Sequence, residues 1–178
     1  MLFRSKYLDN PPIIGQDEIF KTSKRWKNVQ RMYEDTKQFI DNNLVFYVED
    51  DIKIPPDSLK KLLPLMDRPK VCMATGRVMS RQAKDKKGEA LSQALKLRNN
   101  IWFCLPKKDK GVEVVEASTW GCTLIKSSIL RKIYLHLVEK TDWGQDAIFA
   151  DAVRGKYKIL IDWSVHTTHY NWDGRIFE

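Results

Sequence analysis

Residues 44–63, "LVFYVEDDIKIPPDSLKKLL", decide the fold that this sequence predicts. Five mostly apolar residues lead directly into three consecutive carboxylates, and two prolines follow shortly afterwards. The β-branched and aromatic content of residues 43–48 predicts a buried strand. Carboxylates that crowd together repel one another and resist losing water, so we expect a compensating positive group beside them.

The spacing of these carboxylates favours a metal ion as that group. At the end of a strand, side chains two residues apart point the same way, so Glu49 and Asp51 are expected to converge while Asp50 points elsewhere. Oxygen ligands suit Mg²⁺ or Mn²⁺, which keep open positions for water and for the phosphates of a substrate. The alternative is a polar exit from a strand into a turn, because Asp and Pro are ordinary turn residues.

The rest of the chain predicts strands that alternate with helices. Strands are expected at residues 43–48, 70–78, 111–118 and 157–170, and helices at 23–41, 56–66, 86–100, 127–138 and 144–154. This alternation predicts an α/β sheet with helices packed over it. Ligands of such sheets bind at the carboxyl ends of strands, which is where residues 49–51 lie.

Composition and charge restrict the class of partner. The 178 residues fit one domain, and 31 Lys and Arg against 23 Asp and Glu give a net charge of +8. This charge favours anionic partners such as nucleotide phosphates, nucleic acid or an anionic membrane surface. The lysine runs at residues 81–88 and 107–111 contain no aromatic residue on which a base could stack, so we expect solvated faces and no nucleic-acid partner.

Cysteine usage and hydropathy predict a soluble protein of the cytoplasm. Cys72, Cys104 and Cys122 are odd in number and far apart, so they are expected to be core thiols in a reducing compartment. The chain contains no apolar run of the roughly 20 residues that a membrane span needs. Peripheral contact with an anionic membrane stays compatible with the net charge.

Four segments resemble GT-A fold glycosyltransferases, especially the large inverting family 2, and occur in the order found there. Residues 46–63, "FYVEDDIKIPPDSLKKLL", resemble the DxD segment that precedes two prolines and a leucine-rich helix. "EASTWGCTLIKSSILRKI" (116–133) is similar to the acceptor-side segment, and "DWGQDAIFADAVRGKYKILID" (142–162) to the "G-E-D … G-Y-K-I" segment. "SVHTTHY" (164–170) resembles the strand that ends with a histidine near the diphosphate. The resemblance implies one GT-A-like domain, with a Rossmann-like mixed sheet flanked by helices.

This resemblance implies a role for each aligned residue. Asp51 aligns with the carboxylate that binds the metal and Asp50 with the one that contacts the ribose, while Glu49 replaces the more usual first Asp. Asp146 aligns with the base that deprotonates the acceptor hydroxyl in inverting enzymes. Gln145 stands where the family has a Glu.

Two of the assignments have a competitor nearby. Asp151 is the second choice for the base, but it lies about 140° further round an ideal helix than Asp146, so the two cannot face the same atom. His166 and His169 are expected to face opposite sides of the last strand. Of these two, His169 aligns better with the family histidine and joins Glu49 and Asp51 as a predicted metal ligand.

Aromatic residues beside these segments are candidates for stacking on a sugar. Trp120, Trp143 and Trp172 each lie next to a polar or glycine-containing motif. Trp120 and Gly121 are assigned to the donor-binding side. Ordinary packing is the alternative for each tryptophan.

The implied activity is that of a hexosyltransferase that needs Mn²⁺ or Mg²⁺. It would move a sugar from a nucleotide-diphosphosugar donor to the hydroxyl of a glycan, protein or lipid. The family places more sequence before the DxD strand than the 48 residues found here before Glu49. Residues 1–43 are therefore expected to form a shortened nucleotide-side segment, and residues 44–178 the metal, diphosphate and acceptor side of the single domain. Some compact virus-encoded members have such a minimal form, and a member of this kind would act in the host cytoplasm. The alternatives are that the missing part of the base pocket comes from elsewhere, or that the chain is a truncated product.

Two other classes of function stay open at this stage. Glu49, Asp51 and Lys53 form a carboxylate-x-carboxylate-x-Lys run, which is typical of metal-dependent nucleases. Gln145 and the short N-terminal segment fit a non-catalytic, glycosyltransferase-like binding protein.

Overall fold

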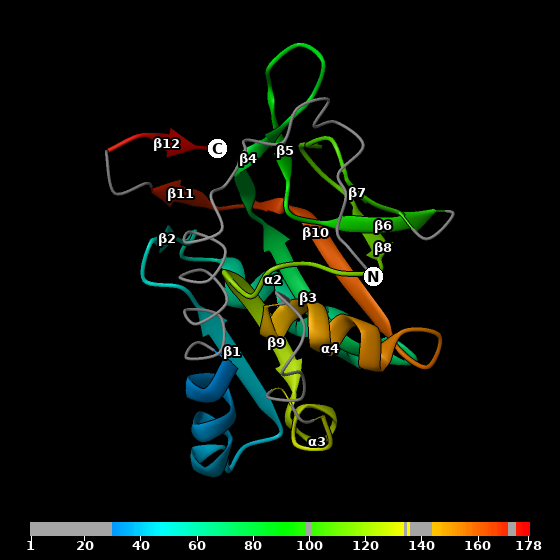
Figure 1. The fold of residues 1–178 in the computed structure, drawn as a ribbon. Coiled ribbons are helices and arrows are strands. Elements are labelled where there is room, and N and C mark those ends of the chain that lie inside the picture. The colour runs from blue at the N-terminus through cyan, green and yellow to red at the C-terminus, as the bar shows by residue number, and fades with distance from the viewer. Residues whose placement is uncertain (1–29, 99–100, 134, 136–143, 171–173) are drawn as a thin grey trace, which may run out of the picture.

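A five-stranded mixed sheet forms the centre of the protein (Figure 1). The computed structural model describes residues 30–98, 101–133, 135, 144–170 and 174–178. The strand order is β1-β9-β3-β10-β8, with bounds of Leu44–Val48, Cys122–Lys126, Val71–Arg77, Lys158–His166 and Val112–Val115. β3 and β10 are parallel, and the other neighbours are antiparallel. The expected mixed α/β sheet is therefore present.

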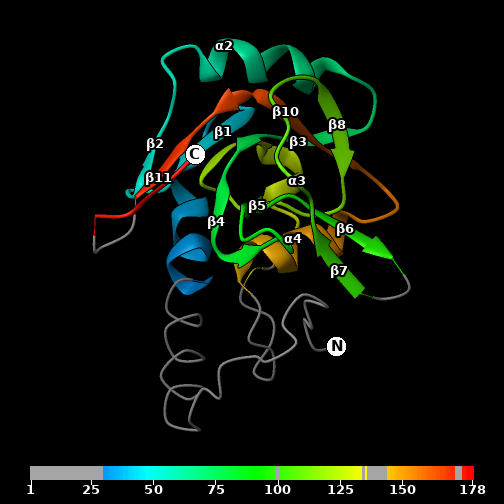
Figure 2. The same cartoon turned by 90° about the horizontal axis from the view of Figure 1, so that it is seen from above.

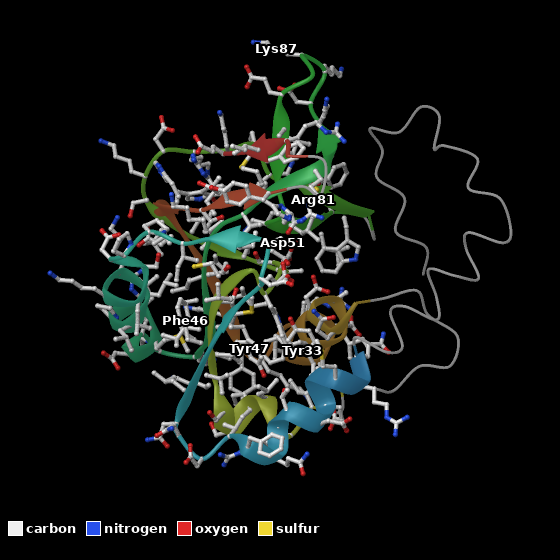
Figure 3. All side chains as sticks on the ribbon, turned by 90° about the vertical axis from the view of Figure 1, so that its left-hand side faces the viewer. Tyr33, Phe46, Tyr47, Asp51, Arg81 and Lys87 are labelled. Atoms are coloured by element: carbon white, nitrogen blue, oxygen red, sulfur yellow. The ribbon has the colours of Figure 1, made fainter. Side chains whose placement is uncertain are left out.

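Helices lie on both faces of this sheet (Figure 2). One face is covered by α2 (Ser58–Leu62) and the 3₁₀ helix η2 (Leu63–Asp67). The other face carries α4 (Gln145–Val153), α3 (Ser127–Leu130), the helical residues 30–36 and the 3₁₀ helix η1 (Lys37–Phe39). β1 contributes to both cores, because Phe46 packs on the α2 side and Tyr47 on the α4 side (Figure 3).

Short strands extend the ends of the central sheet. β2 (Ile52–Lys53), β11 (Thr168–Tyr170) and β12 (Ile176–Phe177) form a three-stranded sheet in the order β12-β11-β2. β4 (Met79–Lys84) continues from β3 and pairs with β5 (Ala90–Ser92), while β6 (Leu95–Arg98) pairs with β7 (Ile101–Cys104). The carboxyl ends of β1, β3 and β10 therefore lead into β2, β4 and β11, where the candidate site lies.

The helix predicted at residues 86–100 is wrong. The described part of this segment forms β5 and β6, after a turn in which Gly88 has a positive φ of 83°. Asp85 organises this turn, because its Oδ1 accepts hydrogen bonds from the backbone N–H groups of Lys87 and Glu89. Lys87 projects at the tip of the β4–β5 hairpin (Figure 3), as expected of a solvated lysine run.

Other predicted elements are shorter than expected or lie partly outside the described residues. The helix predicted at 127–138 is α3 over Ser127–Leu130, and the described part of the helix predicted at 23–41 begins at residue 30. The strand predicted at 157–170 is interrupted at Thr167, between β10 and β11. The remaining predicted strands and helices are present as β1, β3, β8, α2 with η2, and α4.

The three cysteines are free, as predicted. Cys72 and Cys122 are buried and Cys104 is partly buried. Burial raises the pKa of the Cys72 thiol to about 12 and those of Cys104 and Cys122 to about 11, so all three are inert thiols at neutral pH. Within the described residues, none of the helices has both the length and the apolar character that crossing a membrane requires.

Candidate active site

Backbone hydrogen bonds fix the carboxylate turn after β1 on two sides. Glu49 N–H donates to the carbonyl of Gly121 (3.3 Å), and Ile52 N–H donates to the carbonyl of Glu49 (3.1 Å). On the other side, Tyr170 N–H donates to the carbonyl of Asp51 (2.9 Å). The turn is therefore tied both to the segment before β9 and to β11.

Asp51 lies beside two groups from other strands. Its Oδ2 pairs with the guanidinium of Arg81 from β4, and the two side chains point toward each other in Figure 3. The Nε2 atom of His169 from β11 lies 3.8 Å from the same oxygen. The buried Oδ1 of Asp51 accepts no hydrogen bond from the described residues. This oxygen of Asp51 therefore has a lone pair available for a further ligand.

The orientation of His169 suits a metal ligand. Its Nδ1 lies 2.8 Å from the carbonyl oxygen of Met79, which can only accept, so Nδ1 carries the proton. In the neutral ring, Nε2 then presents its lone pair on the side of Asp51. A backbone carbonyl that fixes the opposite ring nitrogen is the usual arrangement around metal-binding histidines.

The predicted trio of metal ligands is only partly assembled. Asp51 and His169 come together, but across the described residues no three His, Cys, Asp or Glu side chains converge as a metal-binding group. A magnesium-type ion takes one or two protein carboxylates and fills its other positions with water and phosphate oxygens. Asp51 and His169 therefore fit a divalent cation that a substrate helps to hold.

Glu49 belongs instead with Asp146. The pKa of Glu49 is raised to about 7, first by burial and then by the negative charges of Asp146 and Asp51. Asp146 lies in the first turn of α4, where its Oδ1 accepts a hydrogen bond from the N–H of Ala147 (2.9 Å). Burial also raises the pKa of Asp146. The site therefore contains a carboxyl pair that holds a proton more tightly than isolated carboxylates do. Asp50 is exposed beside it.

Tyr33 is a member of this site that sequence reasoning missed. Its ring packs edge-on against Trp120 at 5.2 Å between centroids and lies 5.4 Å from the ring of Tyr47. Burial raises the pKa of Tyr33, and the charge of Glu49 raises it further, so the hydroxyl stays a neutral donor beside the carboxyl pair. The sequence feature that could have indicated Tyr33 is its position in the helix predicted directly before β1.

Trp120, which was assigned to the donor site, packs in the core, in line with the alternative of ordinary packing. Its side chain is 0% exposed, and its ring stacks on Tyr47 at 4.9 Å between centroids and meets Phe149 edge-on. A buried ring has no free face for a sugar, so Trp120 is a core residue. The other tryptophan candidates, Trp143 and Trp172, lie outside the described residues.

Gly121 contributes space for Glu49. A Cβ atom at this position would lie 3.1 Å from Cγ1 of Ile52 and 3.2 Å from Oε2 of Glu49. Such contacts are tighter than ordinary van der Waals packing. Glycine therefore allows the Glu49 carboxyl group to pack directly over the backbone.

The competing candidates lie elsewhere. Asp151 is exposed near the end of α4 and pairs with Arg154. His166 is exposed, and its Nε2 lies 2.8 Å from the carbonyl oxygen of Asp109. Lys53 is exposed on β2, so the cation paired with Asp51 within the described part of the chain is Arg81 and not this lysine. Nothing in this arrangement favours the nuclease alternative.

The fold and the site define a mixed α/β protein with a carboxylate and histidine cluster at the carboxyl ends of its strands. No model of a known protein family matches the sequence, and no curated protein does. Among solved structures, the chain is similar to A197 from STIV, with a TM-score of 0.51 and 13% identity over 87% of this chain and 74% of that chain. At this identity the similarity concerns the fold alone.

Proposed function

We propose that this chain is a metal-dependent glycosyltransferase of GT-A-like fold. Its donor substrate would be a nucleotide-diphosphosugar. The observation that carries the proposal is the placement of two groups around one turn. Asp51 lies 3.8 Å from His169, and Glu49, two residues earlier in the same turn, has its pKa raised in part by the charge of Asp146. The first pair suits a cation, and the second suits proton transfer.

Asp51 and His169 would hold a Mn²⁺ or Mg²⁺ ion. Bound there, the ion would neutralise the charge that develops on a departing nucleoside diphosphate. The residues of this chain supply the arrangement: the carbonyl of Met79 orients the His169 ring, and the pairing of β11 with β2 fixes its distance from Asp51. Asp50, exposed on the same turn, would contact the ribose hydroxyls.

Asp146 would act as the base. Its carboxylate accepts the proton of the acceptor hydroxyl while the acceptor oxygen bonds to the anomeric carbon of the sugar. The bond from that carbon to the phosphate oxygen breaks, and its electron pair leaves with the nucleoside diphosphate. Because the acceptor attacks from the face opposite this leaving group, the anomeric centre is inverted. Burial raises the pKa of the Asp146 carboxyl group, which makes it a stronger base than an ordinary aspartate. Proton transfer of this kind contributes about 100- to 10,000-fold to rate.

Glu49 and Tyr33 would support this base. The negative charge of Asp146 helps to raise the pKa of Glu49, so Glu49 would hold a proton near the base, and the Tyr33 hydroxyl stays protonated in the same cluster. The acceptor class is a glycan, protein or lipid hydroxyl, and the protein is proposed to act in the cytoplasm without a nucleic-acid partner.

Isothermal titration tests the proposal. UDP-sugars and GDP-sugars are titrated into the protein with and without Mn²⁺, using wild type and Asp51→Asn. We expect at least one donor to bind wild type in a metal-dependent way and to lose that dependence in the variant. Failure of every donor to bind, with or without metal, would overturn the proposal. Binding without any turnover would favour the non-catalytic alternative.

A further inference from the structure

Arg81 occupies a position that the candidate metal also needs. Its Nη2 atom donates to Oδ2 of Asp51 and to the carbonyl oxygen of Tyr170 (2.7 Å). Figure 3 shows the Arg81 and Asp51 side chains meeting beside the carboxylate turn. The guanidinium is therefore the positive group that sequence reasoning expected next to these carboxylates.

The ion pair leaves hydrogen-bonding capacity unused on both sides. The buried Nε of Arg81 has no hydrogen-bond partner among the described residues, and neither has Oδ1 of Asp51. Arginine and carboxylate groups bind each other most strongly through two parallel hydrogen bonds, which this pair does not make. Both side chains are also partly exposed, at 31% and 38%. Such a pair is weak enough to be exchanged.

We infer that Arg81 holds the place of the cation at Asp51 in the metal-free protein, and moves onto the donor diphosphate when a metal takes that place. This inference rests on the proposed function. A metal bound to Asp51 and His169 would meet the guanidinium at the same carboxylate oxygen, and like charges repel there. Arg81 would keep only the Tyr170 carbonyl as a partner. A diphosphate that arrives with the metal supplies the anionic oxygens that the guanidinium fork matches.

The exchange predicts effects of opposite sign. Arg81 competes with a metal that binds alone, so it weakens metal affinity. Once diphosphate is present, Arg81 adds charge-assisted hydrogen bonds and strengthens nucleotide affinity. Arg81 therefore couples metal and nucleotide binding, and the coupling is reciprocal. A residue with a merely structural role would change both affinities in the same direction.

Two titrations on wild type and variants test the inference. In the first, Mn²⁺ is titrated into the protein without nucleotide, and electron paramagnetic resonance measures the concentration of free Mn²⁺. In the second, UDP and GDP are titrated into the protein at saturating Mn²⁺, and calorimetry measures their binding. We expect Arg81→Gln to bind Mn²⁺ up to about fivefold more tightly than wild type, the range of a partly exposed ion pair. Nucleoside diphosphate should bind the variant roughly tenfold or more weakly, because charge-assisted hydrogen bonds are lost.

Two further variants act as controls. Lys84→Gln removes an exposed charge from the same strand and should change neither affinity. Arg81→Lys keeps the charge but loses the fork, so its Mn²⁺ affinity should stay near that of wild type while nucleotide binding weakens. If Arg81→Gln does not fold, the nucleotide affinity of Arg81→Lys still tests the inference.

Three outcomes would overturn the inference, and they are distinguishable from one another. If wild type binds Mn²⁺ and Arg81→Gln binds it no more tightly, Arg81 does not compete for the site, and the proposed function stands. If both bind nucleoside diphosphate equally at saturating Mn²⁺, the guanidinium does not move onto the phosphates. If neither protein binds Mn²⁺ or nucleotide, the proposed function fails and the inference fails with it.

Discussion

The Nε2 atom of His169 lies 3.8 Å from Oδ2 of Asp51, although the two residues belong to strands far apart in sequence. The pairing of β11 with β2 creates this contact, since His169 is the register partner of Ile52, directly after Asp51. Met79 then fixes the ring through its carbonyl. The backbone thus holds a carboxylate and an imidazole together at the end of β1.

Loss of either side chain should weaken metal binding. We expect His169→Gln and Asp51→Asn each to lower Mn²⁺ affinity by roughly tenfold or more, because even the groups that orient metal ligands contribute 10- to 100-fold. The measurement is Mn²⁺ titration followed by electron paramagnetic resonance. His166→Gln is the matched control, because this histidine is exposed and contacts Asp109. Equal Mn²⁺ affinities in His169→Gln and wild type would contradict the ligand assignment.

Asp146→Asn separates the base from a structural carboxylate. The substitution keeps the shape of the side chain but removes proton acceptance, so donor and metal affinity should change little while kcat falls by about two to four decades. Asp151→Asn is the matched control on the same helix and should be mild, because Asp151 is exposed and pairs with Arg154. Steady-state kinetics on both variants make the comparison. A near-wild-type Asp146→Asn beside an inactive Asp151→Asn would reverse the assignment.

The raised pKa of Glu49 predicts how folding stability depends on pH. In the unfolded chain this carboxyl group loses its proton near pH 4.5, whereas in the folded protein it does so near pH 7. Between these values the folded state binds more protons, so the free energy of unfolding falls as pH rises, by roughly 3 kcal/mol in total, and stays lower above pH 7.

Glu49→Gln should remove this dependence. We expect the variant to be more stable than wild type at pH 8 and to differ little from it at pH 4.5, because glutamine carries no charge to bury. Urea unfolding at the two pH values gives the free energies. Glu89→Gln, on the exposed β4–β5 hairpin, is the control. A Glu49→Gln variant that is destabilised more at pH 8 than at pH 4.5 would show that the Glu49 charge is stabilising.

Gly121→Ala should destabilise the carboxylate turn. The added methyl group would press on Ile52 and on the Glu49 carboxyl group, at 3.1 and 3.2 Å. Overpacking of this kind costs about 1–3 kcal/mol. Urea unfolding measures the cost, and Mn²⁺-dependent nucleotide affinity should fall with it because the distorted turn also carries Asp51. Unchanged stability and affinity would mean that the turn adjusts freely.

Local sequence features were sufficient to predict the elements that carry the carboxylates. The apolar run before Glu49 and the helical pattern after Gly144 mark β1 and α4 through side-chain periodicity, which depends on neighbours in sequence. The same reasoning failed at residues 86–100, where Leu95 and Leu97 fit both a helix and a strand. Pairing of β6 with β7 decided that segment, and pairing is a long-range property.

The contacts of the site were less predictable than its elements. Arg81 belongs to a lysine-rich run that indicated a solvated face, and only the hairpin geometry turns this one side chain toward Asp51. Trp120 lies beside a glycine in a motif, which suggested exposure, but the aromatic side chains of Tyr33, Tyr47 and Phe149 enclose it. Each of these outcomes depends on segments that meet only in the folded chain.

Release of nucleoside diphosphate from a donor tests the central claim most directly. A panel of UDP-sugars and GDP-sugars is incubated with wild type, Asp51→Asn and Asp146→Asn in the presence of Mn²⁺, and the released diphosphate is quantified against a blank without protein. We predict release from at least one donor by wild type, its loss when Mn²⁺ is chelated, and its loss in both variants. Release no greater than the blank for every donor, or release that persists in Asp51→Asn, would contradict the claim.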